Sequence, residues 1–173
     1  IQLVAMQYEK ALFPIFSYFK DHYFRVFLQC VKGKKLCDEI AGQHGMFNDA
    51  GPLWKGNLWD SKLVSRMHST IMKKYIKTKK IINKKSNNTI INDNELLKFL
   101  ETIKDESKIN TVGFYDMHQI AKNKKLKTTI KKEEIIKKIR KRGFKASNTH
   151  FSGTGIRSNL GYDRLISLIK WLR

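Results

Sequence analysis

Residues 122–145 read KNKKLKTTIKKEEIIKKIRKRGFK and decide how the C-terminal third of the chain folds. They hold twelve Lys and Arg against two Glu, a net charge of +10 out of +20 for the whole chain of 173 residues. Ile135, Ile136 and Ile139 fall on one face of a helix predicted over 130–142. Gly143 follows at the C′ position, where helices commonly end. Basic residues on a folded apolar scaffold indicate a surface that binds nucleic acid.

The segments on both sides of this helix predict a compact C-terminal unit. Residues 114–122 have a helical pattern, and residues 144–147 and 156–158 predict a hairpin around Gly153-Thr154-Gly155. A phosphate-binding role for these glycines is the less favoured alternative, because they follow a hydrophilic loop. A last helix carries four apolar side chains on one stripe: Leu165, Ile166, Ile169 and Leu172. Helix, turn, helix and hairpin is a winged-helix-like order.

The first part of the chain predicts a small sheet with helices. Residues 1–12 have a helical pattern that Pro14 ends, and residues 23–31 alternate as a strand does. Residues 37–50 are weakly patterned and predict a short strand with a loop, and residues 51–56 (GPLWKG) predict an aromatic loop. We therefore predict an α+β fold: a small, mostly antiparallel sheet with helices, and a winged-helix-like C-terminal third.

Two further helices and a lysine-rich run lie between these parts. Asp60 and Asp93 each have the residue type of an N-cap and each precede a helical pattern. Residues 73–85 hold seven lysines and no acid, and they lead to Ser86-Asn87-Asn88, a sequence typical of a linker. The chain is therefore predicted to divide into a strand-containing subdomain, 1–86, that holds the Gly-Pro-Leu-Trp loop, and a basic helical subdomain, 87–173.

The composition restricts the class of protein. Hydrophobic residues make up 41% of the chain, which is enough for a folded core. A pI near 10.0 indicates RNA, DNA or an anionic membrane surface as partner, and no apolar run approaches the roughly 18 residues of a membrane span. Lysine outnumbers arginine 28 to 7, a bias that an AT-rich coding sequence would also produce.

The cysteines and the first residues indicate an intracellular protein. Cys30 and Cys37 have neither a zinc-type spacing nor the number of a disulfide scaffold, so we expect a reducing compartment, nuclear or cytoplasmic. The first six residues lack the basic start of a signal peptide. Because Ile1 stands where a complete protein has Met, we expect that the chain begins within a longer protein or, as an equal alternative, that a disordered start has been trimmed.

Motifs typical of enzymes are absent from the sequence. It has no Gly-x-Gly-x-x-Gly, Walker loop, nucleophile elbow or His-Glu-x-x-His, and its acids are too scattered to predict a paired-carboxylate site. Residues 21–25 and 148–150 are polar clusters suited to phosphate or ribose. The structural alternatives are an Arg25–Asp21 pair and a hydrogen-bonded loop histidine, His150.

Aromatic residues offer a second type of contact. Trp54 and Trp59 suit base stacking, although tryptophans in loops more commonly close a domain core. Trp171 and Phe114 are predicted to lie in the core.

Three segments occur in the order found in one known family. They are residues 13–27 (FPIFSYFKDHYFRVF), 50–60 (AGPLWKGNLWD) and 143–159 (GFKASNTHFSGTGIRSN). Together they resemble the C-terminal half of tRNA guanine-26 N2-dimethyltransferases, and the likeness covers nearly the whole chain apart from its lysine-rich middle. Arg157-Ser158 stands where the family usually has Lys-Thr, which preserves the charge and the hydroxyl.

The resemblance implies a division of labour. The family has an N-terminal Rossmann-like domain that binds S-adenosylmethionine and holds a catalytic Asp-Pro-Phe-Gly segment, and the present sequence contains neither that segment nor a Gly-rich cofactor loop. It therefore looks like the tRNA-binding C-terminal domain, with tRNA and its own N-terminal catalytic domain as partners. Some members carry cysteine pairs just before the Gly-Pro-Leu-Trp loop, whereas this chain has only Cys30 and Cys37, so no metal site is predicted.

In this interpretation the cations contact RNA, and the catalytic groups belong to the other domain. Lysines would bind phosphates and set register without reading sequence, and shape recognition suits tRNA because the deep A-form major groove hides the base edges. Arg25, His150 and Arg157 would line the side that faces the catalytic domain. The candidate tRNA-binding residues are Arg25, Lys124, Lys125, Lys127, Lys131, Lys132, Arg140, Arg142, Lys145, His150 and Arg157.

Two other hypotheses remain open at this point. The first is a stand-alone winged-helix module that binds nucleic acid without an enzymatic partner, which leaves the Gly-Pro-Leu-Trp loop and the strand at 23–31 unexplained. The second is a structural domain that is basic only through coding bias, which predicts equal binding to any polyanion.

Overall fold

The computed structural model describes residues 1–47, 49–81, 87–125 and 131–171, without the side chains of 78–81 and 87–93. It has the predicted α+β composition, with helices and small antiparallel sheets. The chain forms two compact units, Ile1–Asp60 with Asn110–Val112, and Ser61–Ile109 with Gly113–Arg173. The boundary predicted at 86/87 stays a prediction, and it falls within the second unit.

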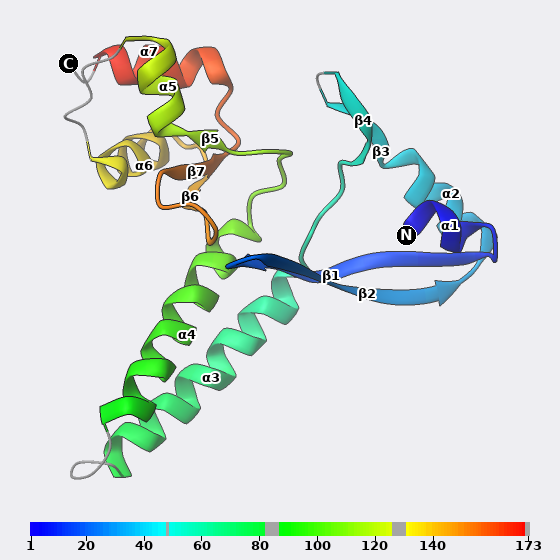
Figure 1. The fold of residues 1–173 in the computed structure, drawn as a ribbon, viewed down its shortest axis with the longest axis horizontal. Helices are drawn as coiled ribbons and strands as arrows, with labels where there is room; N and C mark the ends of the chain where they lie inside the picture. Colours follow the sequence, from blue (N-terminus) through cyan, green and yellow to red (C-terminus); the bar gives the residue numbers. More distant parts are fainter. Residues whose placement is uncertain (48, 82–86, 126–130, 172–173) are drawn as a thin grey trace. The chain divides into compact units, whose positions relative to one another are not determined.

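The first unit is built on a long hairpin. After the short helix α1 (Gln2–Met6), strands β1 (Lys10–Lys20) and β2 (Tyr23–Lys32) pair antiparallel (Figure 1). The helix predicted over 1–12 is thus wrong beyond Met6, and Pro14 lies inside β1. The register shifts between Pro14 and Phe16, which is how a strand accommodates a residue without a backbone N–H. The strand predicted at 23–31 is confirmed.

A helix and a second hairpin complete this unit. Helix α2 (Lys34–Gly42) precedes strands β3 (His44–Phe47) and β4 (Ala50–Trp54), which pair antiparallel. The prediction of a short strand with a loop over 37–50 is wrong as far as Gly42, because these residues form α2. The segment 51–56, predicted as a loop, belongs to strand β4 as far as Trp54. A small core of Ala11, Cys37 and Ile40 joins α2 to β1.

Trp59 anchors the end of this unit. Its side chain is 6% exposed and its Nε1–H donates to the Ser17 carbonyl at 2.7 Å. The neighbouring Asp60 N–H donates to the Ile15 carbonyl at 2.8 Å. Of the two alternatives for Trp59, the structure confirms the core position.

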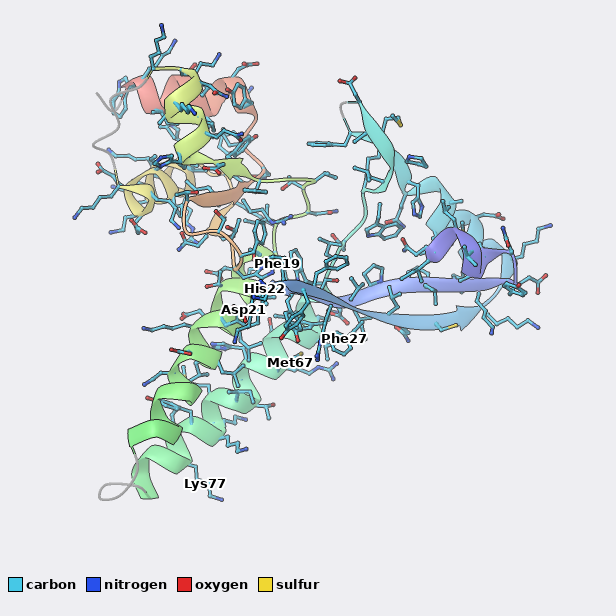
Figure 2. The ribbon with its side chains drawn as sticks, in the orientation of Figure 1. Phe19, Asp21, His22, Phe27, Met67 and Lys77 are labelled. Atoms are coloured by element: carbon cyan, nitrogen blue, oxygen red, sulfur yellow. The ribbon has the colours of Figure 1, made fainter. Side chains whose placement is uncertain are left out.

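Two long helices open the second unit. Helix α3 (Ser61–Ile81) begins directly after Asp60, as predicted, and α4 (Asn87–Glu106) begins before the predicted cap at Asp93. The two helices pack along each other (Figure 1). At 1.5 Å per residue each is about 30 Å long. Figure 2 shows Met67 nearer the start of α3 and Lys77 nearer its end.

A three-stranded sheet with three helices forms the rest. The sheet has the order β5 (Tyr115–Asp116), β7 (Gly155–Ser158), β6 (Ala146–Asn148), with both pairings antiparallel. The helices are α5 (Met117–Asn123), α6 (Lys132–Lys141) and α7 (Tyr162–Trp171). The predicted hairpin, the helix at 130–142 as far as it is described, and the last helix are confirmed. The winged-helix-like arrangement stays a prediction.

Buried aliphatic side chains of α6, α7 and the sheet make one core. The isoleucines of α6, at 135, 136 and 139, are at most 6% exposed, and Leu165 and Leu168 of α7 are fully buried. Gly143 ends α6 with φ 82°, a conformation that favours glycine. The side chain of Leu172 lies outside the described residues.

No helix among the described residues is long and apolar enough to cross a membrane.

Candidate nucleic-acid interface

Helix α6 positions the densest group of cations. Because its three isoleucines point into the core, Lys137 and Lys141 are carried on the opposite face and are exposed. Lys131 at the N-cap and Arg142 at the C-cap are exposed too. We call Lys131, Lys137, Lys141 and Arg142 the α6 basic face.

The charge order along α6 agrees with its helix dipole. Glu133 and Glu134 lie in the first turn, and Lys138, Arg140 and Lys141 in the last. Acids near an N-terminus and cations near a C-terminus each stabilise a helix by about 0.3–1 kcal/mol. The helix can therefore hold this charge without a bound anion, but the cations still gather at its C-terminal end.

One flank of α6 borders an open cleft of about 410 Å³. Three cations line it, Lys108, Arg140 and Lys145, against one acid, Asp105. Asp105 contacts Lys108 Nζ at 3.0 Å and an Arg140 terminal nitrogen at 3.5 Å, in ion pairs that are exposed to solvent. The cleft thus retains a positive excess, beside the half-buried ring of Phe144.

The cleft brings together two of the predicted residues, Arg140 and Lys145. Arg140 Nε donates to the Ala146 carbonyl at 2.8 Å, and Lys145 Nζ donates to the Lys108 carbonyl at 3.0 Å. These bonds to carbonyls fix the side chains and leave their charges in place. Lys108 was not predicted. Only the structure shows that the chain just after α4 lies beside Lys145.

His150 and Arg157 lie in the interior of the unit, where they meet Glu106. The Glu106 side chain is fully buried, and the His150 and Arg157 side chains are 4% and 7% exposed. The His150 backbone N–H donates to Oε2 at 3.1 Å, the His150 ring Nδ1 contacts the same oxygen, and Arg157 Nε donates to Oε1 at 3.2 Å. The alternative of a hydrogen-bonded histidine is thus confirmed.

This buried cluster attaches the β6–β7 hairpin to the end of α4. The ring of Phe99, also on α4, meets the His150 ring edge-on at 5.8 Å. Glu106 was not predicted, although it follows Ile103 by three positions on the same helical stripe. A charge on an apolar stripe is a signal for a buried, paired group.

The other predicted residues lie on separate elements. Lys132 Nζ donates to the Gly153 carbonyl at 2.6 Å. Lys124, at the end of α5, has its Nζ 6.0 Å from the ring centroid of Tyr162. Lys125 is exposed, with φ 48°. Arg25 lies on β2 in the first unit, 5.2 Å from the centroid of Tyr23. Lys127 lies outside the described residues.

Two aromatic residues that were predicted to lie in the core are exposed. The exposed fraction is 68% for Trp171 and 43% for Phe114, so both predicted core positions are wrong. Figure 2 labels Phe19, Asp21 and His22 at the turn end of the β1–β2 hairpin, which places the first polar cluster at an exposed tip.

Comparison with known proteins decides the family. A family model described as N2,N2-dimethylguanosine tRNA methyltransferase matches residues 1–49 and 42–170. The chain belongs to this family. The resemblance noted in the sequence is therefore confirmed.

Relatives in the family are longer proteins. A tRNA (guanine(26)-N(2))-dimethyltransferase of Methanocaldococcus jannaschii is 33% identical over 98% of this chain and 46% of its own length. A tRNA (guanine(26)-N(2)/guanine(27)-N(2))-dimethyltransferase of Aquifex aeolicus is 26% identical over 98% of this chain and 45% of its own length. The chain therefore spans about half the length of these relatives.

A solved structure has the same fold. It is Trm1 from Pyrococcus horikoshii in complex with S-adenosyl-L-methionine, and it matches 97% of this chain and 46% of its own chain with TM-score 0.75 and 30% identity.

The glycine-rich turn of this hairpin is not an open cradle at Gly155. Gly153 lies in the connection between β6 and β7, and Gly155 is the first residue of β7, where an added Cβ would meet Thr149 Oγ1. The chain itself therefore fills the space beside Gly155 and leaves no room there for a cofactor. Metal-type clusters of three or more His, Cys, Asp or Glu are not found in the part of the chain that the structure describes.

Proposed function

We propose that this chain is the tRNA-engaging part of an S-adenosylmethionine-dependent tRNA (guanine-26-N2)-dimethyltransferase. Family membership supports the reaction, and the names of the relatives support the substrate. The cofactor and the catalytic groups would belong to the half of the longer relatives that this chain does not match. That half, the N-terminal catalytic domain, would be its partner.

The exposure of the α6 basic face carries the proposal. Helix α6 buries its isoleucines and leaves cations outward, beside a cleft with three further cations. Such a surface neutralises phosphates and fixes orientation, and it carries no sequence information by itself. A methyltransferase needs this kind of contact because it must hold a folded tRNA while one guanine reaches the methyl donor.

His150 and Arg157 have a positioning role in this proposal. Because both side chains are enclosed with Glu106, they hold the β6–β7 hairpin against α4 and so fix the wall of the basic cleft. Direct phosphate contact is assigned to the exposed cations: Lys124, Lys125, Lys131, Lys137, Arg140, Lys141, Arg142 and Lys145, with Arg25 in the first unit.

The test is a charge reversal of three residues of the α6 basic face. Lys131→Glu, Lys137→Glu and Lys141→Glu are combined, because these side chains are exposed and their loss leaves the core intact. The control is the triple variant Lys32→Glu, Lys34→Glu and Lys35→Glu in the first unit, which removes the same charge from other exposed lysines. Affinity for folded tRNA is measured at several salt concentrations.

The α6 variant should bind tRNA more weakly and with a flatter salt dependence. Each lost phosphate contact lowers the slope of log K against log salt by roughly 0.7–0.9, so three contacts lower it by about 2 to 3. The control should stay near the wild-type chain. An equal loss in both variants would instead indicate the nonspecific basic domain, and an unchanged α6 variant would remove the helix from the interface.

Competition with other nucleic acids separates the remaining alternative. The wild-type chain should prefer folded tRNA to a random single-stranded RNA and to duplex DNA near physiological salt. A preference for duplex DNA would support the stand-alone winged-helix module.

A further inference from the structure

Trp171 at the end of α7 is an exposed aromatic residue next to two cations. Its side chain is 68% exposed. Lys138 Nζ lies 5.4 Å and the Arg142 guanidinium carbon 5.7 Å from its ring centroid. Both cations come from α6, one helical turn apart.

This arrangement orients the indole without burying it. Cations over the face of an indole are attracted by its negative quadrupole, which restricts the ring on the side of α6. Buried tryptophans contribute large apolar areas to a core, and Trp171 does not. The result is a flat apolar surface that faces solvent beside two positive charges.

A second pair of the same kind joins the same two helices. The Arg164 guanidinium of α7 lies 5.9 Å from the ring centroid of Phe144, which follows α6. Aromatic rings interleaved with Arg and Lys are the surface that single-stranded nucleic acids bind, because every base has a face for stacking and every nucleotide a phosphate. The α6–α7 flank has both components.

We propose that Trp171 stacks on one unpaired base of the bound RNA, with Lys138 and Arg142 at the adjoining phosphate. The inference rests on the proposed function and deepens it, because it names an unpaired nucleotide as the ligand of this flank. Bases inside an A-form helix are stacked on their neighbours, so only a loop, bulge or end offers a free face. Stacking tolerates any base, so this contact selects for exposure rather than sequence.

A protein partner on Trp171 is the alternative occupant. It would bury the indole together with Lys138 and Arg142, and two unpaired cations at an apolar interface are costly to desolvate. An RNA phosphate satisfies the same two cations, so the charges favour RNA.

The experiment compares Trp171→Ala and Trp171→Phe with the wild-type chain. The matched control is Tyr8→Ala, because Tyr8 is also 68% exposed but belongs to the first unit. Each protein is titrated with folded tRNA and with a fully paired RNA duplex, at several salt concentrations, and circular dichroism checks that the helices are intact.

Trp171→Ala should bind folded tRNA roughly 5- to 150-fold more weakly, the range for loss of one stacked base. Its affinity for the duplex and its salt slope should stay unchanged, because an indole releases no counterions. Trp171→Phe should keep most of the affinity, and Tyr8→Ala all of it.

Three results would overturn the inference. They are wild-type affinity of Trp171→Ala for tRNA, an equal loss on tRNA and duplex, or a loss for Trp171→Phe as large as that for Trp171→Ala. The outcome is independent of the charge reversal on the α6 basic face. If the lysine variant weakens binding and Trp171→Ala does not, only the stacking inference fails. If the reverse is found, the role of the basic face in the proposed function fails.

Discussion

Replacing Glu106 by alanine should strongly destabilise the second unit. The wild-type carboxylate is fully buried and meets His150 and Arg157, and the Arg157 residue is itself only 6% exposed. Glu106→Ala therefore leaves a buried guanidinium without its anion and removes the acceptor of the His150 backbone N–H. Breaking a buried pair in this way costs about 3–5 kcal/mol.

Urea unfolding, followed by far-UV circular dichroism, measures this loss. With an m value of about 2 kcal/mol/M, the midpoint of the affected transition should fall by roughly 2 M. The neighbouring Asp105→Ala is the matched control, because Asp105 forms only exposed ion pairs with Lys108 and Arg140. Exposed pairs contribute about 0–1 kcal/mol, so its midpoint should move little.

A double variant tests the cause of the loss. Glu106→Leu combined with Arg157→Met removes both charges, and it should recover more than half of the stability because no uncompensated ion stays in the interior. A loss below about 1 kcal/mol for Glu106→Ala would refute the reasoning, as would a double variant no more stable than the single one.

Two further perturbations test local chemistry. Asp116 caps α5, because its carboxylate accepts a hydrogen bond from the His118 backbone N–H at 2.9 Å. Burial alone would raise the pKa of the Asp116 carboxyl, but hydrogen bonds from Gln119, Thr154 and His118 together lower this pKa below the usual 3.8. Asp116→Ala should therefore cost about 1 kcal/mol above pH 4, and the difference in melting temperature should vanish as the pH falls through the folded-state pKa. Burial, followed by the nearby charges of Asp38 and Glu9, raises the pKa of the Cys37 thiol, whereas Cys30 is exposed. A thiol reagent at neutral pH should thus modify one cysteine quickly and the second only slowly, and two equally fast thiols would contradict the buried position of Cys37.

The sequence predicted best where one pattern had one interpretation. Helix α6 has three isoleucines at helical spacing and a terminal glycine, so both its face and its end could be predicted. The β6–β7 hairpin was equally clear, since a glycine-rich connection separates two short runs. In both cases local propensity and tertiary packing favour the same conformation.

The N-terminal segment was predicted less well because its residues suit two structures. Apolar residues between Ile1 and Pro14 fit a helical stripe, but the chain leaves the helix after Met6 and pairs as β1. Pairing with β2 decided the matter, and pairing partners are far apart along a chain.

The candidate site was predictable in charge and not in burial. Lysines could be counted, but whether His150 and Arg157 face solvent depended on Glu106, which lies 44 and 51 positions away. Trp171 shows the opposite error, because an aromatic next to an apolar stripe suggests a core and the helix ends there instead.

The β1–β2 hairpin has a consequence for the behaviour of the isolated chain. It is a two-stranded sheet in which Asp60 and Trp59 bond to carbonyls on the outer edge of β1, whereas β2 has no further strand beside it among the described residues. Strand β2 also exposes Phe24 and Phe27, at 74% and 47%. Unpaired edges with apolar side chains favour association between copies, which the net charge of +20 opposes by repulsion. At 1 M salt the screening length falls to about 3 Å. Salt high enough to release RNA from the proposed α6 interface would therefore also remove the repulsion between hairpins. Under the proposed function, freeing the chain of nucleic acid and keeping it monomeric are opposing requirements.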